Sequence, residues 1–438
     1  MSISRHKSEC GDTVAARRTI AVGMIGTTLV WYDFFLYVGA SVVVFKHQFF
    51  PYLAPLSGVL TGIGLYGAGL VARPLGGLLF GHVGDRFGRR VAVTTTLLLT
   101  GAATGLIGLL PSYRQIGIAA PLLLVALRMA QGLGLGGAWG SAVVISLESA
   151  PPGRRGWVTS WAQIGAPAGN LLAFGVTAAV TACMTPAEFL AWGWRLPFLV
   201  SAVLVAVGLW ARVRIAETRP FRQLSMTGSR PRLPVLTLVT RHRSELMTAA
   251  ALALGMDVAL FTFSFGYVLN ALNVTGLSVV PLLCFTVLAP LALITLIPVF
   301  GALSDRWGRR RVCLAGTAVT ALWAATFPAL FRTGSLPALA VVCLPALLAF
   351  AAALAPQTAL IAELFPSRVR LSGAAIGHQL AGLLGGVLAL FLAEQVTGWG
   401  RAPLAVPLCT AGALTLSGAV LLIAHRSPRE APARGEPA

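Results

Sequence analysis

Long apolar runs separated by short polar segments dominate the chain. Twelve of these runs reach the roughly 20 residues that a helix needs to cross hydrocarbon at about 1.5 Å per residue. They fall at residues 19–45, 57–80, 91–110, 116–147, 157–182, 189–211, 246–271, 279–300, 312–331, 336–361, 372–396 and 403–424. The pattern predicts an all-α membrane protein with twelve transmembrane helices.

One long polar stretch, residues 212–245, follows the sixth run and carries eight arginines. It separates two sets of six runs, which we expect to form two six-helix bundles joined by this linker. The predicted parts are an N-terminal tail (1–18), a first bundle (19–211), the linker (212–245), a second bundle (246–424) and a C-terminal tail (425–438).

The positive charge is distributed unevenly between the polar segments. Of the 33 Lys and Arg, 26 lie in one alternating set of loops and tails, and 4 lie in the opposite set. An excess of Lys and Arg marks cytoplasmic loops, so both termini and the linker are predicted to be cytoplasmic, in a multi-pass protein of a bacterial inner membrane.

Composition agrees with this interpretation and excludes other classes. Charged residues make up 11% of the chain and the mean hydropathy is +0.81, whereas a soluble domain has about 25% charged residues. The net charge of +19 is explained by topology and by attraction to lipid headgroups. No basic-aromatic module indicates nucleic-acid binding.

The two halves repeat each other in their loops. Residues 81–90 read GHVGDRFGRR and residues 301–310 read GALSDRWGRR, 220 positions apart. Residues 148–156 read ESAPPGRRG and residues 363–373 read ELFPSRVRLSG, 215 positions apart. Two echoes at nearly the same offset indicate an internal duplication, which predicts two related bundles with a cavity between them.

The repeated loop motif predicts a latch between conformations. Its glycines permit a tight turn, its aspartate can accept bonds from an arginine or a helix N-terminus, and its arginines hold the loop in the cytoplasm. A topological anchor without a moving part is the alternative. The predicted latch residues are Gly81, Asp85, Arg86, Gly88, Arg89, Glu148, Asp305, Arg306, Arg309 and Glu363.

These motifs resemble those of the major facilitator superfamily, and more narrowly of the metabolite–proton symporter family. The resemblance covers about residues 20–425 and rests on WYDF (31–34), RPLGG (73–77), RMAQGLGLGG (128–137), GWRLPF (193–198) and ELFPSRVR (363–370). It implies twelve helices, uptake driven by the proton gradient, and a small organic acid or zwitterion as the substrate.

Two membrane carboxylates that the family usually has are replaced here. Val30 precedes WYDF and Ala138 follows the paired glycines of the fourth helix, where a glutamate is usual at each position. Their replacement leaves the mode of proton coupling open.

The charged residues that remain inside apolar runs need a reason, because each costs about 2.5–3.5 kcal/mol at the bilayer centre. Asp33 and Asp257 are candidate proton-coupling residues, and a structural hydrogen bond is the alternative for each. Arg128 is a candidate partner of Asp33 or anchor of a substrate carboxylate. Arg73, before Pro74, is expected to extend toward the interface at least as readily as to act in transport.

Uncharged polar groups supply further candidates for substrate binding. Gln163 and Asn170 could line the cavity, and His378 with Gln379 could contribute a titratable group and an amide. Tyr32 lies beside Trp31 in WYDF. Because aromatic faces attract quaternary ammonium groups, these residues leave a betaine-like substrate as an alternative.

No nucleotide loop, metal-ligand cluster or activated nucleophile is evident, and the six cysteines are scattered. We therefore expect no enzyme activity, no cofactor and no metal. The expected partners are a metabolite, a proton and the lipid bilayer, around a monomer. Export, exchange or uniport on the same fold, and a non-transporting sensor, remain alternatives to proton-coupled import.

Overall fold

The computed structural model describes residues 20–21, 23–37, 39–51, 55–213, 217–227, 232–262, 279–331, 336–397 and 405–423. Every long element in this part of the chain is a helix, as the long apolar runs predict. The tails at 1–18 and 425–438 lie outside the described residues.

The described residues of the first half form six long helical segments, the first of which includes residues 23–37. The others are α3 (Pro55–Arg86), α4 (Arg89–Gly108), α6 (Ala119–Ser149), the pair α7 (Arg155–Gln163) and α8 (Gly165–Ala182), and α10 (Arg195–Val213). Five short elements connect these helices: η1 (Ser41–Phe45), α2 (Lys46–Phe49), α5 (Tyr113–Ile116), α9 (Pro186–Glu188) and η2 (Phe189–Gly193).

The second half supplies six more. They are α13 (Arg243–Phe261), α15 (Val279–Trp307), α16 (Arg309–Phe331), α17 (Leu336–Glu363), α18 (Arg370–Thr397) and α19 (Ala405–Ile423). Within the described residues, eight helices are long and apolar enough to cross a membrane by length and composition. The predicted twelve-helix membrane fold is confirmed.

The observed helices differ from the predicted runs in some of their bounds. The second helix, predicted to end at residue 80, continues as α3 to Arg86, so Gly81 and Asp85 lie on its last turns. Polar residues can continue a helix beyond hydrocarbon, and the chain turns only at Gly88, whose φ is +126°. The predicted linker also contains two short helices, α11 (Arg219–Met226) and α12 (Pro234–Arg241).

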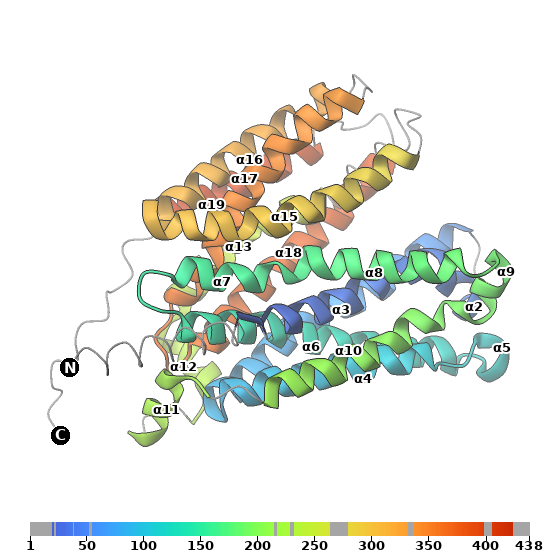
Figure 1. Ribbon diagram of the computed structural model, residues 1–438, viewed down its shortest axis with the longest axis horizontal. Helices are drawn as coiled ribbons and strands as arrows, with labels where there is room; N and C mark the ends of the chain where they lie inside the picture. Colours follow the sequence, from blue (N-terminus) through green and yellow to red (C-terminus); the bar gives the residue numbers. More distant parts are fainter. Residues whose placement is uncertain are drawn as a thin grey trace, which may run out of the picture.

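The two bundles pack against each other at one end. In Figure 1 the yellow-to-red helices lie along the blue-to-green ones near α12 and diverge from them toward α9. Small residues permit this approach: a Cβ on Gly140 of α6 would lie 2.6 Å from Cβ of Ala375 on α18. Likewise, a Cβ on Gly81 of α3 would lie 2.7 Å from Cα of Ser372. The bundles therefore meet almost backbone to backbone at this end.

Candidate functional site

Four polar side chains from both halves form an interbundle cluster: the buried Arg73 of α3, His378 and Gln379 of α18, and the partly buried Asp257 of α13. The Arg73 Nε donates a hydrogen bond to Oε1 of Gln379 over 3.0 Å. The Gln379 Nε2 donates to the carbonyl of Gly136 over 3.2 Å. Side chains of the second half thus bind the first half directly.

Asp257 and His378 face each other within this cluster. The His378 Nδ1 lies 3.8 Å from Oδ2 of Asp257, which is too long for a hydrogen bond. Both atoms are buried, and neither has a hydrogen-bond partner among the described residues. The positive charge of Arg73 acts on both side chains. The cluster therefore combines the cation of Arg73 with a carboxyl oxygen and an imidazole nitrogen that accept or donate no hydrogen bond among the described residues.

Aromatic rings of the first half flank the cluster. The Trp139 ring stacks on the His378 ring with 3.7 Å between centroids. The Trp139 Nε1 donates a hydrogen bond to Oε1 of Gln163 over 2.9 Å. The Arg73 guanidinium carbon lies 5.9 Å from the ring centroid of Trp31. Flat apolar surfaces and separated charges thus adjoin at the boundary between the bundles.

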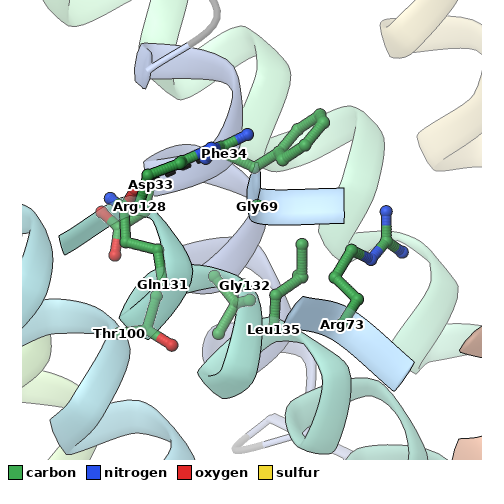
Figure 2. A pocket seen from close by; sticks show the side chains of 10 residues that line it. Asp33, Phe34, Gly69, Arg73, Thr100, Arg128, Gln131, Gly132 and Leu135 are labelled. Atoms are coloured by element: carbon green, nitrogen blue, oxygen red, sulfur yellow. Dashed lines mark hydrogen bonds between the residues drawn. The ribbon is translucent and has the colours of Figure 1, made fainter. Parts of the chain in front are cut away.

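A second polar group lies inside the first bundle. Asp33 and Arg128 line one small cavity of about 10 Å³, which has room for about one water molecule. Figure 2 shows Asp33, Arg128 and Gln131 on one side of this pocket and Arg73 on the other. In this conformation the cavity is too small for a metabolite.

The guanidinium of Arg128 lies over the Tyr37 ring, 4.0 Å from its centroid, and its Nη1 contacts Oε1 of Gln131 at 3.4 Å. The Gln131 Nε2 donates to the Thr104 hydroxyl over 2.6 Å. The Asp33 carboxyl lies beside the hydroxyls of Thr104 and Ser201. Arg128, Gln131 and Thr104 thus form a chain of contacts that leads to the Asp33 carboxyl.

The first latch joins the end of α3 to the start of α18. Asp85 accepts hydrogen bonds from the backbone N–H groups of Leu371 (3.2 Å) and Ser372 (2.8 Å), in the first turn of α18. Arg89 pairs with Asp85 at 3.2 Å and with Glu148 at 3.4 Å, and all three side chains are fully buried. A carboxylate at a helix N-terminus satisfies free N–H groups and complements the helix dipole.

Arg370 completes this first latch. Its Nη1 lies 3.4 Å from Oε1 of Glu148, so one arginine from each half contacts the same carboxylate. The linker covers the group: the Thr218 hydroxyl donates to Glu148 over 2.6 Å, and the Phe221 ring lies 5.0 Å from the Arg89 guanidinium carbon.

The second latch repeats the arrangement with the halves exchanged. Asp305 at the end of α15 accepts hydrogen bonds from the N–H groups of Gly156 (2.9 Å) and Trp157 (2.8 Å) at the start of α7. Arg309 pairs with Asp305 at 3.1 Å and also with Glu363. Arg155 of the first half lies 3.4 Å from Glu363. This copy is more open to solvent, because the side chain of Arg155 is 46% exposed.

Comparison with known proteins identifies the architecture. A model of sugar (and other) transporters matches residues 19–225, and a model of the Major Facilitator Superfamily matches residues 283–438. The inner membrane metabolite transport protein YhjE of Escherichia coli is 34% identical over 96% of this chain and 97% of its own. The shikimate transporter of E. coli is 36% identical over 87% of this chain and 88% of its own. The chain belongs to the major facilitator superfamily.

Other relatives and the solved structures agree. The proline/betaine transporter of E. coli is 31% identical over 88% of this chain and 79% of its own. The proton:xylose symporter XylE, bound to 6-bromo-6-deoxy-D-glucose, has a TM-score of 0.75 at 18% identity, over 94% of this chain and 95% of that one. This member of the superfamily is therefore a multi-pass secondary transporter and not an enzyme.

The predicted site residues fall into separate places in this transporter. Asp257, His378 and Gln379 come together between the bundles, and Gln163 reaches them through Trp139. Tyr32 is wholly buried, and its hydroxyl donates to the carbonyl of Pro197 over 2.7 Å. It packs within the first bundle and does not reach the interbundle cluster.

Asn170 lies on α8, and its Oδ1 is buried without a hydrogen-bond partner among the described residues. Arg86 is exposed at the end of α3, where its Nη1 contacts the carbonyl of Arg232 at 3.4 Å. Arg306 is exposed at the equivalent place on α15. Neither arginine contacts the latch carboxylates in the described contacts, unlike Arg89 and Arg309.

Three residues of these sites are missing from the predicted set. For Arg73 the sequence left open extension to the interface or a part in transport; the side chain is 4% exposed and does not reach the interface, because α3 continues for 13 residues beyond it, to Arg86. Arg155 and Arg370 complete the two latches. Both lie within the second repeated motif, so the 215-residue offset could have identified them as a pair.

Proposed function

We propose that this transporter imports a small organic anion together with a proton, and that the interbundle cluster binds both. The observation that carries the proposal is the bond between Arg73 and Gln379 across the two bundles, beside Asp257 and His378. A side chain at the boundary of two moving bodies changes its partners when they move, which is what alternating access requires.

Arg73 is the proposed anchor for the substrate carboxylate. Its guanidinium is a planar fork that matches a carboxylate in two-point geometry. In the described conformation the Arg73 Nε donates to the Gln379 amide oxygen, so an incoming anion would compete with this amide for the guanidinium. The Trp31 and Trp139 rings offer flat surfaces for the apolar part of the substrate.

The proton is proposed to bind a carboxyl that loses a cationic neighbour when the substrate arrives. An anion that neutralises Arg73 removes a favourable charge from the side of Asp257, which favours the protonated carboxyl. One ligand then promotes binding of the other, as symport demands. Asp33 remains a second proposed proton-binding group, and Arg128 its partner through Gln131 and Thr104.

A zwitterionic substrate is a second candidate, favoured by the placement of Arg73 and Asp257 on opposite bundles. A carboxylate could bind the arginine while a quaternary ammonium group lies near Asp257 and the Trp139 ring. Relatives named as proline/betaine transporters support this class, whereas the shikimate transporter supports an organic acid.

Flux into vesicles that contain the purified protein would test both versions. We expect labelled shikimate to accumulate when the interior is alkaline, and to respond little to membrane potential, because an anion and one proton carry no net charge. Glycine betaine with one proton carries a positive charge and should respond to both. Uptake that ignores the pH gradient for every probe would contradict symport and favour a uniporter or an exchanger.

The remaining topological predictions belong to the same proposal. We place the latch end, where α3 meets α18 and α15 meets α7, on the cytoplasmic side of a bacterial inner membrane. This orientation is supported by the charge asymmetry of the loops and by the name of the relative YhjE as an inner membrane protein. The described conformation would then be closed toward the cytoplasm.

A further inference from the structure

The linker helix α12 has two faces of different character. Pro234 and Leu238 are buried, and Val235 packs partly buried on the same core. The opposite face exposes Leu236 and Val239 by more than half, at 56% and 54%. A helix with one face packed and large aliphatic side chains on the other leaves an apolar surface without a protein partner in the described chain.

The position of α12 suggests what covers this surface. The helix packs on α3, α13 and α18, which are helices of the membrane-embedded bundles. Met247, in the second turn of α13, is 65% exposed and belongs to a membrane span. The helix α12 therefore lies at the end of the bundles, beside the start of a candidate membrane span.

The charge around α12 fits one kind of partner. Arg232, Arg241 and Arg243 flank the helix and are all exposed, and no acidic residue occurs from position 232 to position 243. Apolar side chains between exposed arginines are the pattern of a helix that lies in the membrane interface, where its cations meet headgroup phosphates.

We propose that α12 is an interfacial helix that binds anionic phospholipid. Leu236 and Val239 enter the boundary between headgroups and acyl chains, and Arg232, Arg241 and Arg243 contact the phosphates. This site is separate from the interbundle cluster, and it does not depend on which substrate the transporter carries.

Photo-crosslinking of the full chain tests this proposal. The variants Leu236→benzoylphenylalanine and Val239→benzoylphenylalanine would be reconstituted in phosphatidylcholine vesicles with a minor share of phosphatidylglycerol. After illumination, mass spectrometry identifies what is attached. Arg154→benzoylphenylalanine is the matched control, because Arg154 is exposed in a polar loop before α7.

We expect lipid adducts at positions 236 and 239 and few at position 154. Phosphatidylglycerol should exceed its share of the vesicle about fivefold, the effect of one arginine at a charged surface. Replacing Arg232, Arg241 and Arg243 with Gln should remove this enrichment while lipid adducts persist. Two outcomes would overturn the proposal. One is crosslinking to a second copy of the chain without any lipid adduct, and the other is lipid adducts that are not enriched in phosphatidylglycerol.

Discussion

Arg73 is the residue whose surroundings depart furthest from its expected role. A buried arginine must have compensating partners, and its Nε donates to Gln379 from the other bundle. Asp257 and His378 lie within its electrostatic reach. In the proposed mechanism, the same side chain holds the closed arrangement and releases it when an anion arrives.

Replacing Arg73 with Lys should weaken substrate binding while preserving the charge. Lysine lacks the planar fork, and loss of one charge-assisted hydrogen bond costs about 1.5–3 kcal/mol. We therefore expect KM for uptake to rise about tenfold or more, measured from initial rates in vesicles. Arg195→Lys is the control, since Arg195 contacts backbone carbonyls in the first bundle. Equal KM values in the two variants would contradict an anchoring role.

The two membrane carboxyls can be distinguished by comparing accumulation with exchange. Asp257→Asn and Asp33→Asn keep shape and remove the proton-binding group. The variant that lacks the coupling carboxyl should lose accumulation against a gradient, yet exchange labelled for unlabelled substrate. If both variants concentrate substrate with unchanged pH dependence, the proton binds elsewhere, and His378 is then the next group to replace.

At the scale of elements, helix ends carry the contacts between bundles. Asp85 and Asp305 each cap the first turn of a helix in the opposite half. Gly88 and Gly308 follow at equivalent positions, with φ of +126° and +95°, so each turn needs a backbone conformation that favours glycine. The first latch is buried beneath the linker, and the second is partly exposed.

Asp85→Asn and Asp305→Asn should alter the transport rate more than the amount of folded protein. Each change weakens contacts made in one conformation, which corresponds to a population shift of about 1–3 kcal/mol. We expect the larger effect at Asp85, because exposed ion pairs contribute about 1 kcal/mol or less. Normal rates in both variants at equal membrane abundance would show that the latches do not govern the cycle.

At the scale of the whole molecule, two duplicated bundles meet at one end and enclose polar groups at their boundary. Because the halves are duplicated, equivalent ion pairs form in both directions between them. Arg370 of the second half pairs with Glu148 of the first, and Arg155 of the first half pairs with Glu363 of the second. Both latches therefore join the two halves at the same end, and we propose that both break when this end opens.

Labelling of introduced cysteines would test the orientation of the molecule. Ser225 lies on α11 of the linker and Ser112 precedes α5 at the far end. Because arginines are concentrated on the linker side, Ser225→Cys should react from the cytoplasm and Ser112→Cys from the opposite side. Reaction of both positions from one side would overturn the topology.

The sequence by itself determined the membrane class, the twelve helices and the duplication, and it singled out Asp85 and Asp305 through their repeated motif. These features follow from local quantities: the length of each apolar run, the charge of each loop, and motifs repeated at a fixed offset. Asp85 and Asp305 could be predicted because a short motif places them at helix ends, where free N–H groups need acceptors.

Only the tertiary structure decided which buried polar groups meet. The sequence proposed Arg128 as a partner of Asp33, but it did not show that Gln131 and the Tyr37 ring also contact the guanidinium. Arg73 and Gln379 lie 306 positions apart and meet because small residues let α3 and α18 approach. Partners across an interface depend on helix rotation and depth, which periodicity within one helix does not specify.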